Sequence, residues 1–278
     1  MPTLSFIVPL RDGLPLTQAM LRSLRATIPA DLEHEIVFVD DASTDGTPAW
    51  LKELRDPVRS LRLERTGGYA RASNRGASSA RGSLLVLLNN DLEFPRGWLE
   101  PMLEAHRRLG ERAGAVGNVQ RNFRTGEIDH AGLFIDHKGK PEHLRRLPAR
   151  LFRALAPVRR VAAATGACLL IERALWERLG GFDEAYLNGC EDVDLCFRAA
   201  ALGRINAVAL RSVVRHHVSA TPGRKDRDEA NARRLALRWA ETLAQWGEPD
   251  WSRNHFETYL PEPRDFPDRA LALAVAFY

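Results

Sequence analysis

Short, largely apolar runs that end at polar residues alternate with helical patterns in the first half of the chain, and this alternation constrains the fold most strongly. Leu4 to Val8 and Glu35 to Val39 are the first two runs, and Leu61 to Glu64 is a shorter third. Between the first two, apolar residues recur at helical spacing: Leu16, Met20, Leu21 and Leu24. Such strand-helix-strand units predict an α/β fold in which helices flank a mostly parallel central sheet.

A fourth apolar run, Leu84 to Leu88, predicts a strand that is buried on both faces. It leads directly into Asn89, Asn90 and Asp91. Open α/β sheets bind ligands outside the carboxyl ends of their strands, so Asp91 is a candidate site residue. Taken alone, the three residues are equally typical of a turn, because Asn and Asp side chains hydrogen-bond to nearby backbone.

A glycine-rich segment, Gly67 to Gly76, introduces a predicted helix of small residues. The N-terminus of a helix attracts anions such as diphosphates, and Arg71 adds a fork-shaped donor. A dinucleotide-binding fold would instead require Gly-x-Gly-x-x-Gly directly after the first strand, where this chain has Pro9 to Gly13. The phosphate-binding loop of ATPases and GTPases is absent as well, so the sequence excludes both classes.

In the second half, an acidic cluster opens another predicted helix. Its carboxylates suit the positive end of a helix dipole, and Asp194 with Arg198 is expected to form an ion pair of modest surface value. Glu191 and Asp192 are less well explained by structure alone. Two adjacent carboxylates repel each other when both are charged, which favours proton uptake by one of them, as a general base requires.

Two histidines follow a further predicted strand, Ser212 to Arg215. A single histidine is more often structural than functional. Together with Asp91, however, His216 and His217 supply the nitrogen and oxygen atoms that bind a divalent metal. His216 is the predicted ligand, and His217 is the alternative if the strand register shifts by one residue.

These motifs, in this order, resemble family 2 inverting glycosyltransferases of the GT-A fold, in particular their rhamnosyltransferase-like bacterial branch. The resemblance covers residues 3–222 and rests on several ordered motifs. They are Ser5 to Pro9, Val39 to Thr47, Gly67 to Gly76, Leu87 to Asp91, Thr165 to Ala167, Gly180 to Asp183, Glu191 to Arg198, and His216. The family's Asp-x-Asp motif appears here as Asn89-Asn90-Asp91, so only its last position keeps a carboxylate.

The resemblance implies that the chain transfers a sugar, with inversion, from a nucleotide-diphosphate donor to a hydroxyl of a glycan or lipid-linked acceptor. Asp192 is then the catalytic base with Glu191 beside it, Gly166 and Glu191 lie at the substrate, and Asp91 and His216 hold Mg²⁺ or Mn²⁺. The donor is expected to contact Pro9, Arg11, Asp41, Arg71, Asn74, Asn90 and Asp91. Bacterial surface polysaccharide synthesis is the implied process.

Two other functions remain alternatives at this stage: a non-catalytic module that binds nucleotide sugars or glycans on the same fold, and a sugar nucleotidyltransferase. Nucleic-acid binding is not expected, because a net charge of +4 comes without a basic stripe or a DNA-binding motif. A signal peptide and a membrane-spanning run are not recognisable, so a cytoplasmic location is expected. The oligomeric state is left open.

The resemblance divides the chain into a GT-A domain over residues 1–222 and a helical extension over residues 223–278. In the extension, Leu235, Trp239, Leu243 and Trp246 recur at helical spacing, which is typical of packing onto the domain. Before it, Leu144 to Val161 interleaves arginines with apolar residues. A packed amphipathic helix is the favoured interpretation there, and weak peripheral contact with anionic lipid is the alternative.

Overall fold

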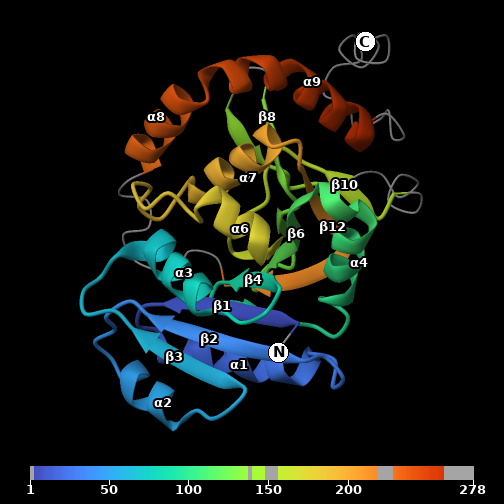
Figure 1. The fold of residues 1–278 in the computed structure, drawn as a ribbon. Helices are drawn as coiled ribbons and strands as arrows, with labels where there is room; N and C mark the ends of the chain where they lie inside the picture. The colour runs from blue at the N-terminus through green and yellow to red at the C-terminus, as the bar shows by residue number, and fades with distance from the viewer. Residues whose placement is uncertain (1–2, 137–139, 148–155, 218–227, 260–278) are drawn as a thin grey trace.

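The computed structural model describes residues 3–136, 140–147, 156–217 and 228–259. The first half alternates strands and helices as predicted (Figure 1). Its elements are β1 (Leu4–Leu10), α1 (Leu14–Thr27), β2 (His34–Asp40), α2 (Thr47–Glu53), β3 (Val58–Arg62), α3 (Gly68–Ser79) and β4 (Leu84–Leu88). Strand β3 begins earlier than predicted, because this edge strand alternates polar and apolar residues and has no apolar run to mark it.

The second half adds longer strands and further helices. In chain order they are β5 (Leu92–Glu93), α4 (Glu100–Leu109), the 3-10 helix η1 (Gly110–Arg112), β6 (Ala113–Asn122), β7 (Ile128–His130), β8 (Leu133–Ile135), β9 (Pro141–His143), β10 (Val158–Arg160), β11 (Cys168–Glu172), α6 (Arg173–Leu179), α7 (Glu191–Ala201) and β12 (Ile205–His216). Strands β8 and β9 pair with each other in a small second sheet, and Leu133 of β8 also forms an isolated bridge with Ala163.

The main sheet has the strand order β10-β12-β6-β11-β4-β1-β2-β3, with β5 paired to β12 and β7 to β6. From β4 to β3 all neighbours are parallel, whereas β11 is antiparallel to both β4 and β6, so the sheet is mixed beyond β4. Because β11 is antiparallel to both of its neighbours, β6 runs in the same direction as β4. Strand β12 is parallel to β6 and therefore runs in that direction too. The carboxyl ends of β1, β2, β4, β6 and β12 therefore lie along one edge.

Strand β4 is the centre of the sheet, and its alternating side chains enter two different cores. Leu85 and Leu87 pack with residues of α3, α6 and α7, whereas Val86 and Leu88 pack with residues of α1 and α4. All four side chains are fully buried. The prediction of a strand buried on both faces is confirmed, and burial fixes the end of β4 that delivers Asp91.

Two C-terminal helices, α8 (Asp228–Arg238) and α9 (Ala240–Tyr259), lie against α7 and β8 (Figure 1). Trp239 and Trp246 pack edge-on against Phe197 of α7, with ring centroids 5.5 and 5.6 Å apart. Leu235 and Leu243 are buried in the same core. The predicted helical packing of these four residues is confirmed, while the division into domains at residue 222 stays a prediction.

The pair of Asp194 and Arg198 is not the surface ion pair that the spacing suggested. Asp194 is completely buried and accepts hydrogen bonds from Arg198 Nε at 2.8 Å and Trp239 Nε1 at 2.9 Å. Arg198 also donates to the carbonyls of Leu179 and Gly181. The pair therefore joins α7 to the end of α6, to the turn that follows it and to the C-terminal helices.

We expect Asp194→Ala to destabilise the fold by about 3 kcal/mol or more, because it leaves a largely buried guanidinium without its counter-charge. Urea unfolding monitored by tryptophan fluorescence would measure the loss. Glu104→Ala is the matched control, since Glu104 pairs with Arg107 and Arg108 on the exposed face of α4 and its loss should change stability far less than the loss of Asp194. Equal losses in the two variants would contradict the structural role of Asp194.

The segment from Leu144 to Val161 does not form one continuous helix. Residues 148–155 lie outside the described part of the chain, but Val158–Arg160 forms strand β10, which pairs with β12. Arg159 is buried and donates to Asn254 Oδ1 of α9 at 2.8 Å. For the described residues of this segment the helix prediction is therefore wrong. Pairing with β12 and the contact with α9 outweigh the local sequence pattern. In the described residues no helix is long and apolar enough to cross a membrane.

Candidate active site

The loops that follow β1 and β2 are tied together at the carboxyl edge of the sheet. Asp12 Oδ1 accepts hydrogen bonds from the backbone N–H groups of Thr44 at 2.6 Å and Asp45 at 3.2 Å. In return, Asp45 Oδ2 accepts one from the N–H of Leu14, the first residue of α1. Sequence reasoning missed both aspartates. Their place beside glycines, between a strand and a helix, was the available signal.

Among the predicted donor contacts, Pro9 lies buried at the end of β1 and Arg11 is exposed just beyond it. Asp41, which follows β2, is almost fully buried. Its two carboxylate oxygens accept hydrogen bonds from the N–H groups of Gly67 at 2.7 Å and Gly68 at 2.9 Å. Asp41 therefore holds the turn that starts α3, and a contact with the donor base stays a prediction.

Gly67 lies under the side chain of Arg71. A Cβ atom at this position would lie 2.4 Å from Cδ of Arg71, whose stem crosses the turn. Arg71 itself is exposed near the N-terminus of α3. This geometry fits the predicted anion site, because the N-terminus of a helix and an arginine both attract phosphate.

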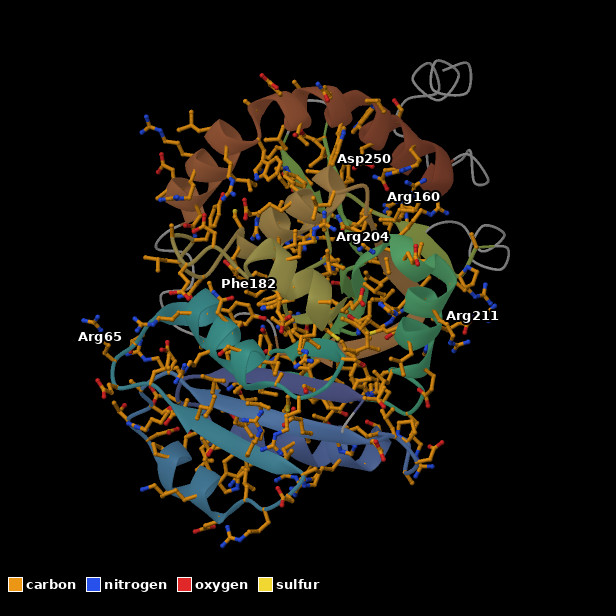
Figure 2. All side chains as sticks on the ribbon, viewed as in Figure 1. Arg65, Arg160, Phe182, Arg204, Arg211 and Asp250 are labelled. Carbon is orange, nitrogen blue, oxygen red and sulfur yellow. The ribbon has the colours of Figure 1, made fainter. Side chains whose placement is uncertain are left out.

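The side chain of Asn74 binds the turn after α6, whereas the predicted contact was with the donor. Its amide donates to the carbonyl of Phe182 and to Glu184 Oε1, and its Oδ1 accepts from the N–H of Phe182 at 2.9 Å. Phe182, labelled in Figure 2, packs its ring against Tyr69 and Trp176. These bonds fasten the turn after α6 onto α3, so a donor contact by Asn74 remains a prediction without support from its hydrogen bonds.

Asp91 and His216 face each other where the chain leaves β4 and enters β5, which pairs with β12. This arrangement is fixed because Leu92 pairs with His216 and the N–H of His217 donates to the Asp91 carbonyl at 3.0 Å. Asp91 Oδ1 lies 3.3 Å from His216 Nε2, and both side chains are buried. The ring of His217 lies elsewhere, stacked on Phe123, so His216 is the histidine that faces Asp91.

The pair fits a divalent cation. Within the described residues, Asp91 Oδ1 and both ring nitrogens of His216 have no hydrogen-bond partner. Leaving buried polar atoms unpaired is costly, and a metal ion bound between the two side chains would satisfy Asp91 Oδ1 and the ring nitrogen that faces it, Nε2. The described chain brings no third His, Cys, Asp or Glu into a metal-binding group with them. Mg²⁺ commonly binds through one or two protein groups plus phosphate oxygens and water, so two protein ligands are sufficient.

The neighbouring asparagines do not join the pair. Asn90 donates from its amide nitrogen to Thr17 Oγ1 of α1 at 2.9 Å, which fastens the loop after β4 to that helix. The N–H of Asn89 donates to the carbonyl of Ala167 at 2.9 Å. The first two positions of the Asn-Asn-Asp motif therefore shape the loop, and the role of Asn90 toward the donor stays a prediction.

A buried histidine near His216 was not predicted. His130 Nδ1 lies 2.8 Å from His143 Nδ1, and its Nε2 has no hydrogen-bond partner among the described residues. Burial and the rings of His143 and His216 hold the pKa of His130 well below its usual range, so the ring is neutral at pH 7. An isolated histidine in a short strand gave no sequence signal for this proximity.

Asp192 and Glu191 begin α7 and differ in exposure. Glu191 is buried, and its Oε2 accepts a hydrogen bond from the N–H of Gly189 at 2.6 Å. Asp192 is partly exposed. Its Oδ2 accepts from the N–H of Gly166 and its Oδ1 from the N–H of Val193, both at 2.8 Å. Of the two carboxylates, Asp192 is the one that a substrate can reach.

Gly166 lies between the carboxylate of Asp192 and the loop that carries Asp91. Its N–H binds Asp192, and the next residue, Ala167, accepts the hydrogen bond from Asn89. A Cβ atom at Gly166 would lie 3.2 Å from the ring of Tyr69 and 3.5 Å from Cβ of Asp192. The contact with Asp192 would be ordinary, whereas the one with Tyr69 would be tight, so the absence of a side chain allows the Tyr69 ring to approach the backbone closely.

Tyr69 is a site residue that the sequence did not reveal. Its hydroxyl donates to the carbonyl of Gly166 at 2.6 Å, on the other side of the residue whose N–H binds Asp192. Burial, with the carboxylates of Glu191 and Asp192 nearby, raises the pKa of Tyr69 well above its usual value. The hydroxyl therefore stays protonated as a donor, and Tyr69 positions Asp192 through Gly166.

We expect Tyr69→Phe to lower the maximal rate by up to about tenfold with little change in donor affinity, because one neutral hydrogen bond contributes roughly 0.5–1.5 kcal/mol. Steady-state rates over a range of donor concentrations would separate kcat from KM. Tyr186→Phe is the control, since its hydroxyl is buried and has no hydrogen-bond partner among the described residues. An unchanged kcat in Tyr69→Phe would remove Tyr69 from the site.

Comparison with solved structures identifies the fold. GalNAc-T7 with UDP, GalNAc and Mn²⁺ superposes with a TM-score of 0.66 at 21% identity, over 78% of this chain and 44% of that one. The mannosyltransferase PcManGT from Pyrobaculum calidifontis, in complex with GDP-Man and Mn²⁺, gives a TM-score of 0.63 at 24% identity, over 99% of this chain and 75% of that one. The predicted GT-A fold is confirmed.

Sequence relatives include the O-antigen biosynthesis protein RfbC of Myxococcus xanthus, which is 32% identical over 228 residues. The match covers 79% of this chain and 18% of RfbC, and a Sinorhizobium fredii relative is likewise covered over only 26% of its length. The N-acetylglucosaminyl-diphospho-decaprenol L-rhamnosyltransferase of Mycobacterium tuberculosis is 28% identical over 216 residues, which is 68% of each chain. Residues 5–179 match the model of glycosyl transferase family 2, and the chain belongs to that family.

Proposed function

We propose that the protein is an inverting glycosyltransferase that moves a sugar from a nucleotide-diphosphate donor to a hydroxyl of a glycan or lipid-linked acceptor. The proposal rests on one arrangement. Asp91 and His216 are buried side by side, and Asp91 Oδ1 and the ring nitrogens of His216 have no hydrogen-bond partner among the described residues. Residues 165–167 link this pair to the partly exposed carboxylate of Asp192. A cation-binding pair and a general base on one connected loop system are the two groups that such a transfer requires.

The donor would lie along the carboxyl edge, with its nucleoside over the loops after β1 and β2 and its diphosphate toward α3 and Asp91. Arg11 and Arg71, both exposed at this edge, offer positive charge to the phosphates. Asp91 and His216 would hold Mg²⁺ or Mn²⁺, which supplies charge stabilisation for the departing diphosphate when bound.

Asp192 would act as the base. As the acceptor oxygen forms its bond to the anomeric carbon, the bond to the diphosphate oxygen breaks on the opposite face, and Asp192 takes the hydroxyl proton. Attack from the opposite face inverts the anomeric configuration. The hydrogen bonds from Gly166 and Val193 keep the carboxylate in a fixed orientation during this step.

The relatives support a role in bacterial surface polysaccharide synthesis, since one is an O-antigen biosynthesis protein and another a rhamnosyltransferase. A deoxyhexose such as rhamnose is accordingly the first donor sugar to test. The solved neighbours hold UDP in one case and GDP-Man in another, so the panel must include several bases. We place the reaction in the cytoplasm, at the inner face of the plasma membrane when the acceptor is lipid-linked.

A panel of nucleotide-diphosphate sugars, incubated with Mn²⁺ or Mg²⁺, tests the proposal. Slow release of the nucleoside diphosphate from at least one donor without acceptor, abolished by excess chelator, is the expected result. Binding of a donor without any release would favour a non-catalytic module. Formation of pyrophosphate from a nucleoside triphosphate and a sugar phosphate would indicate a nucleotidyltransferase instead.

A further inference from the structure

One large apolar side chain is exposed beside the Asp91–His216 pair. Phe123, which directly follows β6, is 41% exposed. Its ring stacks on the imidazole of His217, with centroids 3.9 Å apart and planes inclined by 24°. The backbone adds a further restraint, because the N–H of Phe123 donates to the carbonyl of His216 at 2.9 Å. One face of the phenyl ring is covered by His217.

The turn that carries Phe123 is held by its own hydrogen bonds. Asn122 Oδ1 accepts from the N–H groups of Arg124 at 2.9 Å and Thr125 at 3.1 Å, and Arg121 donates to the carbonyl of Gly126 at 2.6 Å. A side chain on such a turn loses little conformational freedom when a ligand binds. The exposed ring is thus prepared to act as a contact surface.

The position of the ring indicates which substrate it can meet. Strands β2 and β6 lie two strands away from β4 on opposite sides, which corresponds to roughly 10 Å each way. The loops expected to hold the nucleoside follow β1 and β2, whereas Phe123 follows β6. The ring is joined to Asp91 through His217, whose N–H donates to the Asp91 carbonyl. Strand β6 neighbours β12, which carries His216, and is four strands away from β2, so the ring lies beside the Asp91–His216 pair and far from the loops expected to hold the nucleoside.

The chemistry of the ring indicates the class of ligand. The face of an aromatic ring is electron-rich and attracts partial positive charge. A pyranose presents C–H groups with such charge on one face and keeps its hydroxyls around the rim, free for transfer. A single phenyl ring is too small to cover a lipid chain.

We propose that Phe123, backed by His217, is the platform on which the acceptor's pyranose ring stacks. The inference rests on the proposed function and deepens it: the acceptor presents a sugar ring next to the reacting hydroxyl, instead of a peptide or an open-chain polyol. Substitution of Phe123 should weaken acceptor binding and leave reaction of the donor with water unchanged.

Saturation-transfer NMR with a panel of methyl pyranosides (glucose, galactose, N-acetylglucosamine, mannose and rhamnose) is the direct test. The wild-type protein should transfer saturation to ring C–H protons of at least one pyranoside. Phe123→Ala should reduce the signal at least fivefold, and Phe123→Trp should restore it. Leu202→Ala is the matched control, because Leu202 is 42% exposed at the end of α7 and should leave the signal unchanged.

Donor hydrolysis in the same variants separates this inference from the proposed function. Phe123→Ala should hydrolyse the donor at the wild-type rate. Absence of hydrolysis in every variant, with Phe123-dependent pyranoside binding intact, would overturn the transferase and leave a sugar-binding platform. Pyranoside binding that is undetectable, unaffected by Phe123→Ala, or displaced by a nucleoside diphosphate would overturn the platform.

Discussion

Asp192→Asn is expected to bind the donor like the wild-type protein and to transfer sugar at least about 100-fold more slowly, the usual scale for loss of a general base. Asparagine keeps the size of the side chain and an oxygen that can accept the N–H of Gly166, so the fold around α7 should survive. It cannot take up the acceptor proton. Transfer rates at saturating donor, combined with a direct measurement of donor affinity, would show whether only the chemical step is affected.

Glu191→Gln is the matched control for this prediction. Glu191 is adjacent in sequence but buried, with its Oε2 bound to the N–H of Gly189. Glutamine retains an acceptor oxygen there, and transfer should fall far less than in Asp192→Asn. If Asp192→Asn transfers near the wild-type rate while Glu191→Gln does not, the two carboxylates exchange roles and Glu191 is the base.

Asp91→Ala should abolish metal-dependent donor binding. Removing one of the two proposed ligands leaves His216 as the single proposed protein ligand among the described residues, and the expected loss of Mn²⁺ affinity is on the order of 100-fold or more. Titration of Mn²⁺ followed by electron paramagnetic resonance, with and without a nucleoside diphosphate, would measure the loss without any need for turnover.

Glu93→Ala provides the comparison for the metal site. Glu93 lies two residues after Asp91 in β5, is partly exposed, and pairs with Arg215 at 3.4 Å. Its loss changes the local charge by the same amount and should leave Mn²⁺ affinity within about twofold, as expected for a partly exposed charge. Full activity of the wild-type protein in excess chelator would contradict a metal-dependent mechanism.

The fold could be predicted where burial follows a simple pattern. Strand β4 is fully apolar because helices cover both faces, and the carboxylate at its end is recognisable for the same reason. Strands β6 and β12 are long and contain polar residues such as Asn118 and Ser212, so no apolar run marks their full extent. The antiparallel direction of β11 could not be deduced either, since it depends on which strands β11 pairs with.

The candidate site could be predicted only in part, because the same residue types serve ligands and loops. Asp41 and Asn74 were assigned to the donor, yet in the structure their polar atoms bind the turns at 67–68 and 182–184. Asp194 was assigned to the surface and is completely buried. Tyr69 and Phe123 were missed, since an isolated aromatic residue gives no signal until tertiary contacts place it beside Gly166 or His217.

The anomeric configuration of the sugar first released from the donor shows whether the transfer proceeds with inversion. Proton NMR during donor hydrolysis with Mn²⁺ distinguishes the initial anomer before the two anomers equilibrate, and it requires no acceptor. The first anomer should have the configuration opposite to that of the donor, because water attacks from the face opposite to the diphosphate. Release with retained configuration would contradict a single displacement assisted by Asp192.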